Sequence, residues 1–441
     1  MTSPVDPSTT PAPMAEPRRS GGLGRLWRRA FSPFWMVPAM CCLFALAAGL
    51  LLPQVDEELG QYVPFLFQAG PDGARSMLST IAGAMISVTG LVFSITIVVL
   101  QLASSQFSPR VLRTFLDDRT PQLTLGIFSA SFVYALTVMR DVSGSSDGSA
   151  EPVPQIALTV AFVLVLASVG LFLAFIHHIT QSISVDTIIR TVGQETLALV
   201  RRGRPTSKEH PDAGERDDSP GPGSARAPSE DPGQVVVLVE SSGYLNSVNH
   251  RDLIALASRH DGCVTMLQPL GTYVVTSQPV ALVTCPGGRD DVDWGAEVRK
   301  NLRIAWRRSM DQDVTFGLRQ LVDIGERALS PGVNDPTTAV QVLNQLHTIL
   351  HCMIETGEVS TRMRDEDGRV RLVSSEWSFG EYLDLCVDEI AHWGAVSVQI
   401  PARLNQMLVQ LEQIANPAQR EKLQTKRYAV ESQARQARER A

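Results

Sequence analysis

The chain of 441 residues carries a formal net charge of −7 and has a mean hydropathy of +0.03. Its charged residues are spread along the sequence, which excludes the concentrated basic surface of a nucleic-acid-binding protein, so we expect no nucleic-acid partner. The six cysteines form no CxxC pair and no spacing typical of structural zinc. The mean hydropathy averages two different parts, because residues 36–179 hold four apolar blocks, whereas residues 1–30 and nearly everything after residue 180 have the composition of a soluble protein.

Four segments are long and apolar enough to cross a bilayer, whose hydrocarbon core of about 30 Å requires about 20 helical residues. They cover about 36–53, 77–103, 122–139 and 156–179. The third segment is the shortest, and without it the C-terminal half would lie on the opposite side of the membrane. We therefore predict a membrane α-helical fold with four transmembrane helices in residues 31–180, followed by an α+β cytoplasmic domain.

The charges of the connecting segments predict the orientation of these helices. Five arginines between residues 18 and 29 precede the first span, and Arg110, Arg113 and Arg119 follow the second. The connections at 54–76 and 140–155 carry mostly acidic charges, together with Gly and Ser. Because cytoplasmic loops are enriched in Lys and Arg, we expect both termini of this multi-pass protein to be cytoplasmic, with residues 1–30 as a disordered basic tail.

The second span carries small and polar residues at regular intervals. Thr80, Ser87, Ser94 and Gln101 recur every seven residues, and Gly83, Gly90 and Ser104 fall between them. Positions three and four apart share one face of a helix, so these seven residues form one stripe, here called the polar stripe. Small residues of this kind favour close helix packing in lipid. The same stripe, contributed by several copies, would also suit the lining of a water-filled path.

The sequence after the fourth span divides into five segments by composition. They are a juxtamembrane helix (181–202), a flexible linker (203–233), a small β-rich unit (234–290), a helical domain (291–415) and a charged C-terminal helix or tail (416–441). In the β-rich unit, GTYVVTSQPVALV predicts two strands around a polar turn. From Asp293 onward, VDWGAEVRKNLRIAWRRS has a helical pattern.

A loop between two predicted helices is a candidate anion site. Asp335 before Pro336 is typical of an N-cap followed by a first-turn proline, and a helix N-terminus presents free amides. Arg319 or Arg327 could support an anion there. The candidate residues are Arg327, Ser330, Gly332, Asn334 and Asp335. Ordinary helix capping is the alternative interpretation.

Two histidines one helical turn apart, His347 and His351, are spaced to share a metal ion. The sequence HTILH lacks the carboxylate of an HExxH motif, so we interpret both as core or surface histidines. No nucleophile and base pair, phosphate-binding loop or metal-ligand set is recognisable elsewhere. We therefore expect no enzyme, no cofactor and no metal site.

Two stretches, ISVTGLVFSITIVVLQLASSQFSPRVL and FGLRQLVDIGERALSPGVNDPTTA, carry a resemblance to a known family. With the four-span layout, they make the chain similar, from about residue 31 to about residue 415, to a bacterial family of predicted integral membrane proteins with a domain of unknown function. The resemblance implies a protein of the plasma (inner) membrane. It implies no catalytic residues.

Two functions are compatible with these features. The first is a homo-oligomeric channel or pore in the lipid bilayer, with the second span lining the path of an ion and the cytoplasmic domain regulating it. The second is a membrane-anchored sensory or interaction protein, whose cytoplasmic domain binds a small ligand or a partner without any transport. The absence of Asp, Glu, Lys and Arg between residues 78 and 106 argues against a proton relay in the second span.

Overall fold

The computed structural model describes residues 35–59, 70–106, 119–142, 153–182, 184–203, 233–285, 292–357 and 359–440. The predicted tail (1–30) and nearly all of the predicted linker (203–233) lie outside these residues. The described chain forms two compact units. The membrane unit contains residues 35–100 and 119–179, and the C-terminal unit contains residues 180–440 together with the last residues of the second span, 101–106.

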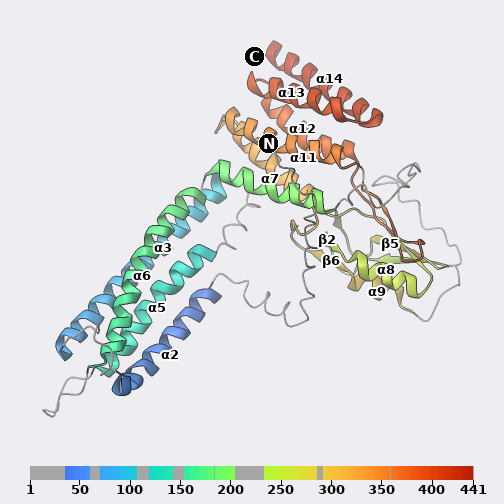
Figure 1. Cartoon of the computed structure of the whole chain (residues 1–441). Helices are drawn as coiled ribbons and strands as arrows, with labels where there is room; N and C mark the ends of the chain where they lie inside the picture. Colours follow the sequence, from blue (N-terminus) through green and yellow to red (C-terminus); the bar gives the residue numbers. More distant parts are fainter. Residues whose placement is uncertain are drawn as a thin grey trace, which may run out of the picture. The chain divides into compact units, whose positions relative to one another are not determined.

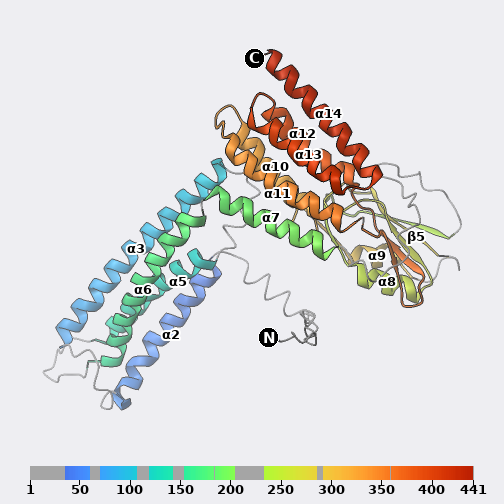
Figure 2. The same ribbon diagram turned by 45° about the horizontal axis from the view of Figure 1, so that its top comes forward.

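The membrane unit consists of four long helices that lie side by side (Figures 1 and 2). They are α2 (Met36–Leu59), α3 (Pro71–Gln106), α5 (Arg119–Asp141) and α6 (Gln155–Ser182). Each is long and apolar enough to cross a membrane by its length and composition. The prediction of four membrane helices followed by a domain of strands and helices is therefore confirmed.

The third span, α5, is the least apolar of the four and also the most buried. More than half of its apolar window is buried inside the chain, compared with less than a quarter in each of the other spans. Its polar side chains find partners there: the Tyr134 hydroxyl donates to the Ala157 carbonyl at 3.0 Å, and the hydroxyls of Ser131 and Ser168 lie 3.3 Å apart. A helix that contacts protein rather than lipid can carry such groups without exposing them to hydrocarbon.

The C-terminal unit contains two β-sheets. The larger has the strand order β1 (Gln234–Leu238), β5 (Pro279–Thr284), β3 (Cys263–Met266), β8 (Val370–Val373), β7 (Arg362–Arg364). Its strands pair antiparallel except β3 and β8, which are parallel. The smaller sheet has the order β4 (Tyr273–Val274), β2 (Gly243–Val248), β6 (Leu302–Ala305) and is antiparallel.

These sheets differ from the sequence-based expectations in two respects. The segment after Asp293, expected to be helical, forms the short helix α9 (Trp294–Lys300) and then strand β6. Pairing with β2 overrides the local helical pattern, because β-structure depends on neighbours distant in sequence. The two strands predicted in GTYVVTSQPVALV exist, but β4 and β5 belong to different sheets, with Ser277 in the turn at a φ of +67°.

The helices of the C-terminal unit begin with α7 (Val185–Arg202), followed within the β region by α8 (His250–Arg259). Later in the chain come α10 (Val314–Leu329), α11 (Pro336–Glu355), α12 (Phe379–Gly394), α13 (Gln399–Ile414) and α14 (Pro417–Arg440). The charged C-terminal segment is thus a helix, and it packs against the others. It buries Leu423 and Val430, and Lys426 Nζ lies 2.6 Å from a carboxylate oxygen of both Asp384 and Asp388 on α12.

A buried ion network joins the β7–β8 hairpin to the turn before β3. Arg371 Nε lies 2.6 Å from Asp365 Oδ2, and Arg371 Nη2 lies 2.8 Å from Asp261 Oδ1. The side chains of Arg371 and Asp365 are only 7% and 8% exposed. The hydrogen bond from Arg371 lowers the pKa of Asp365 from 3.8 to about 2, so this carboxylate stays ionised in the folded protein.

The Asp365→Asn variant should therefore be less stable than wild type at pH 7, because a neutral amide leaves the buried guanidinium without its main counter-ion. The lowered pKa means that the stabilisation is complete above pH 4 and is lost as the pH falls toward 2. In thermal unfolding experiments in detergent, the decrease in Tm between pH 4 and pH 2 should be smaller for the variant than for wild type. Asp311→Asn is the control, since its pair with Arg303 is exposed. Equal behaviour of the two variants would contradict the prediction.

Candidate functional site

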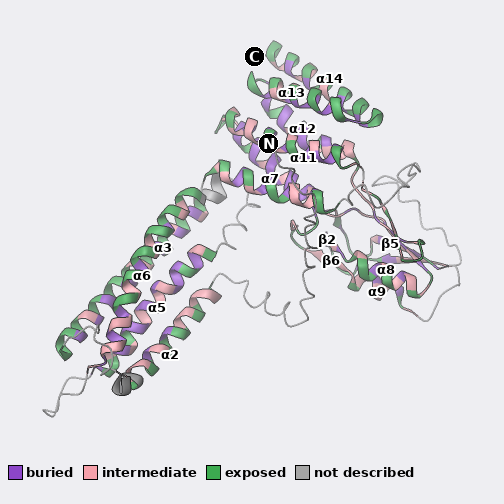
Figure 3. Cartoon of the chain, in the orientation of Figure 1, coloured by how far each residue is buried: buried purple, intermediate pink, exposed green. Residues whose placement is uncertain are grey.

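The polar stripe of α3 lies on the face that points away from the rest of the chain. The described stripe side chains are all exposed: Thr80, Gly83, Ser87, Gly90, Ser94 and Gln101. The side chain of Ser104 lies outside the described residues. The opposite face of α3 packs within the membrane unit through Ala74, Leu78, Ile81, Ala82, Met85, Val92 and Val99. Figure 3 shows exposed residues along α3 beside the buried ones.

Packing inside this chain does not explain the small residues of the polar stripe. A Cβ atom added at Gly83 or Gly90 would meet nothing within 4 Å. The hydroxyl of Thr80 donates to the Ser76 carbonyl at 2.8 Å, and that of Ser87 donates to the Gly83 carbonyl at 2.9 Å. Both hydroxyls therefore bond to their own helix, and both side chains are exposed. Any close approach that the glycines permit must be made by something outside the described chain.

The other two outward-facing spans have apolar exposed faces. On α6 the exposed residues from Phe162 to Ile176 are apolar or Gly, and the serine of that stretch, Ser168, is buried against Ser131. On α2 the exposed residues from Ala39 to Leu51 are likewise all apolar. Faces of this composition suit contact with lipid chains. The α3 face, with two serines, a threonine and a glutamine, is different from both.

At the predicted anion site, the Asp335 carboxylate occupies the N-terminus of α11. It accepts from the Thr338 amide at 3.1 Å and from the Thr338 hydroxyl at 2.6 Å, and these bonds lower its pKa. Ser330 donates its hydroxyl to the Arg327 carbonyl, and Asn334 takes a φ of +48° in the turn. A carboxylate in this position competes with any external anion, so the arrangement is that of helix capping.

One of the two arginines expected near this loop, Arg319, pairs with carboxylates instead. Arg319 is held by three carboxylates, with Nε 2.7 Å from Asp323, Nη1 2.6 Å from Glu389 and Nη2 3.4 Å from Glu326. Arg327 is exposed, as are Gly332 and Asn334. The structure thus brings Ser330 and Asp335 into one capped turn, without adding a cationic group from Arg319.

The paired histidines of α11 face different partners. Arg403 Nη2 lies 3.0 Å from His347 Nδ1, and His351 Nδ1 lies 3.3 Å from Glu355 Oε2. Burial, with contributions from Arg403 and His351, lowers the pKa of His347 to about 4. Within the described part of the chain, no three His, Cys, Asp or Glu side chains are placed to hold a metal ion.

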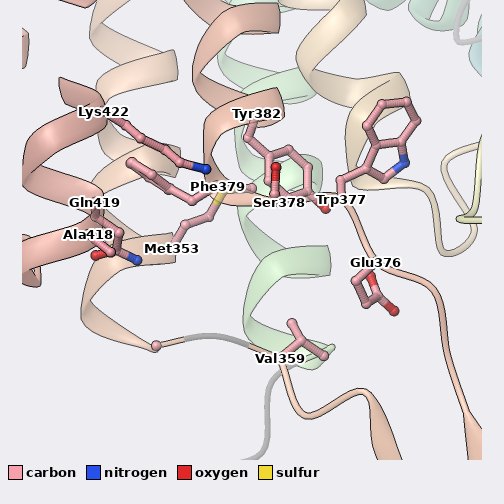
Figure 4. Close-up of a pocket in the computed structure, with 11 residues that line it drawn as sticks. Met353, Val359, Glu376, Trp377, Ser378, Phe379, Tyr382, Ala418, Gln419 and Lys422 are labelled. Atoms are coloured by element: carbon pink, nitrogen blue, oxygen red, sulfur yellow. The ribbon is translucent and has the colours of Figure 1, made fainter. Parts of the chain in front are cut away.

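A cavity in the C-terminal unit, which the sequence did not predict, is a second candidate site. One chamber of about 200 Å³ is bounded by α11, α12 and α14, and Figure 4 shows its lining, with Lys422 and Glu376 on opposite sides of Tyr382. A second chamber of about 350 Å³ lies between α7, α11 and the β region. The two share the lining residues Met353, Val359, Glu376 and Tyr382.

The chemistry of the cavity suits a small organic molecule. The walls combine apolar side chains, such as Met353 and Phe379, with polar and charged ones, among them Arg202, Glu376 and Lys422. His250 contributes an imidazole whose pKa is lowered by burial, so it is neutral at pH 7. Ligand sites combine apolar walls with polar groups that orient the ligand. These residues come from seven separate segments of the chain, and none belongs to a recognisable sequence motif.

The comparisons with known proteins place the chain in a family. Residues 32–410 match the family described as a predicted membrane protein, DUF2254. Uncharacterized proteins of Mycobacterium bovis and Mycobacterium tuberculosis are each 32% identical over 398 residues, which cover 89% of this chain and 74% of the relative. No solved structure matches. The chain, with its four apolar helices and mixed C-terminal unit, therefore belongs to the predicted membrane protein family DUF2254.

Proposed function

We propose that copies of this chain assemble in the bilayer through α3 and that the polar stripe lines a passive path for ions or small solutes. The observation that carries this proposal is the direction of the stripe. Its six described residues face away from the packed interior of the chain, while the exposed faces of α2 and α6 are apolar. An outward polar face in a membrane helix favours contact with water or with another protein surface.

The chemistry of the stripe favours passive passage of ions or small solutes over ion-coupled transport. Its side chains are neutral, so no charge is desolvated in the span and no proton relay is available. Hydroxyls that already bond to their own helix still have lone pairs with which to coordinate a permeating cation or water. Flanking exposed residues on α3, including Phe93 and Val98, supply the apolar groups that would narrow the path.

Cross-linking tests the assembly. In membranes holding the full chain with Ser94→Cys, a bifunctional thiol reagent should join two copies, because the proposal places this position near its symmetry mate. Leu166→Cys on the exposed apolar face of α6 is the matched control, and wild type controls for the native cysteines. Failure of Ser94→Cys to cross-link above both controls would contradict assembly through α3.

The cavity favours a second candidate function, in which the C-terminal unit senses a small ligand. This function requires no permeation and is compatible with assembly through α3 alone. Flux measurements on cross-linkable protein in vesicles distinguish a passive path from a purely sensory function. A cross-linked but impermeable assembly would favour the sensory function, and a thermal-shift screen of small metabolites against the full chain would then identify what binds near Tyr382.

A further inference from the structure

Two connections in the C-terminal unit expose large apolar side chains. Trp393, in the last turn of α12, is 46% exposed, and the α12–α13 connection that follows exposes Val396 by 66% and Val398 by 78%. The α10–α11 connection exposes Val333 by 51%. No charged residue occurs between Trp393 and Arg403. Exposed apolar groups in this density mark a contact surface. We call these four residues the apolar tip.

Both connections lie at one end of the helices. Trp393 Nε1 donates to Glu326 Oε1 at 3.0 Å, and a Cβ at Gly325 would lie 3.2 Å from Ile390. The last turns of α10 and α12 are therefore side by side, and the connections that follow them extend from the same end. Figures 1 and 2 show these two connections together in both views.

Helix α7 begins at that same end. A Cβ at Gly193 would contact Gln345 of α11, and a Cβ at Gly317 of α10 would contact Thr196 of α7. At 1.5 Å per residue, Gln345 lies about 14 Å from the start of α11, and Gly317 lies about 18 Å from the end of α10. The Thr196 contact is thus about 4 Å farther from the α10–α11 connection than the Gly193 contact. Thr196 follows Gly193 by three residues, or about 4.5 Å of helix, so α7 runs away from this connection, parallel to α11. Extrapolation places Ser184 level with the α10–α11 connection.

The short connection between α6 and α7 limits how far the start of α7 can lie from the membrane. The apolar span of α6 ends at Gln181 and α7 begins at Val185. Four residues of fully extended chain reach only about 14 Å. The start of α7 must therefore lie close to the surface of the bilayer that α6 crosses.

We propose that the apolar tip contacts the lipid–water interface of that bilayer. Trp is well suited to this layer because its ring is apolar and its N–H is polar. Arg190, in the second turn of α7, and Arg327, in the last turn of α10, are exposed near the same end. Their positive charges complement anionic headgroups. The contact does not depend on whether α3 lines a path.

Lipid quenching tests this contact in the full chain. A fluorescent amino acid replaces Val396 or Val398, and the protein is reconstituted in vesicles of phosphatidylethanolamine and phosphatidylglycerol that contain a lipid with a nitroxide headgroup. Val275, an exposed valine of the same unit that follows β4, is the matched control. Leu270, shortly before β4, accepts a hydrogen bond from Trp377 at the opposite end of α12. We expect at least about twofold stronger quenching at 396 and 398 than at 275.

Water-soluble iodide completes the test. Strong iodide quenching at 396 and 398, with lipid quenching no greater than at 275, would show that the apolar tip is exposed to water and overturn the proposal. Weak quenching by both agents would show that another protein surface covers the tip, which would overturn it equally. With Val396 and Val398 both replaced by Asp, a probe at Val333 should lose lipid quenching relative to the same probe in the otherwise unchanged chain.

Discussion

Leucine at both Ser87 and Ser94 should reduce ion flux into vesicles holding the protein by at least about tenfold. Both residues are exposed on the polar stripe, and each substitution replaces a hydroxyl with a larger apolar group. If the stripe lines a path, the two leucines remove polar surface and narrow the path at two levels, one helical repeat of seven residues apart. An apolar constriction of this kind excludes water, and hence ions.

The matched control is Ala167→Leu, which adds a leucine to the exposed face of α6. It should leave flux unchanged, because that face already presents apolar groups. Cross-linking through Ser94 is lost in the double variant, so its assembly is checked by size-exclusion chromatography in detergent. Undiminished flux in an assembled double variant would refute a path along the stripe.

Replacing Trp294 by Ala should lower the free energy of unfolding of the C-terminal unit by about 3–5 kcal/mol. The indole is 2% exposed in the core between the sheets and α8, and it lies so close to Gly262 that a Cβ there would meet it at 3.2 Å. Neighbours held by two sheets cannot collapse into the space that it leaves. For a unit of this size the loss corresponds to a fall of roughly 10 °C in Tm.

Trp306→Ala tests whether burial, and not residue type, causes that loss. Trp306 follows β6 and is 75% exposed, so its removal should change the free energy of unfolding by no more than about 0.5 kcal/mol. Thermal unfolding of the full chain in detergent, followed by near-ultraviolet circular dichroism, gives both values. Similar Tm values for the two variants would show that Trp294 is not essential to this core.

Local signals were sufficient wherever the structure depends on neighbours close in sequence. Asp335 before Pro336 predicts a helix start, and the Asp335 carboxylate does cap α11. Local signals were insufficient at β6, where the segment 292–309 has a helical pattern but its second half pairs with a strand more than fifty residues earlier. Local signals also did not predict that β4 and β5 belong to different sheets, because sheet membership depends on the partner strands and not on the turn between the two strands.

The cavity illustrates the same limit for a site. Glu376 and Tyr382 are unremarkable in the sequence, and they become lining residues only because α7, α11, α14 and the β region meet around them. The apolar tip is similar, since Val333 and Val396 are sixty-three residues apart in the chain. Their common location follows from the pairing of α10 with α12.

Composition and helical periodicity were sufficient to predict the four membrane spans, the family and the membership of the polar stripe. Each depends on composition or on the helical repeat, which are local properties. The direction in which the stripe faces could not be predicted in this way. The same spacing is compatible with a stripe turned inward or outward, and the packing of Leu78, Met85 and Val92 against the neighbouring helices turns it outward. That direction is a property of contacts between helices, and no single helix encodes it.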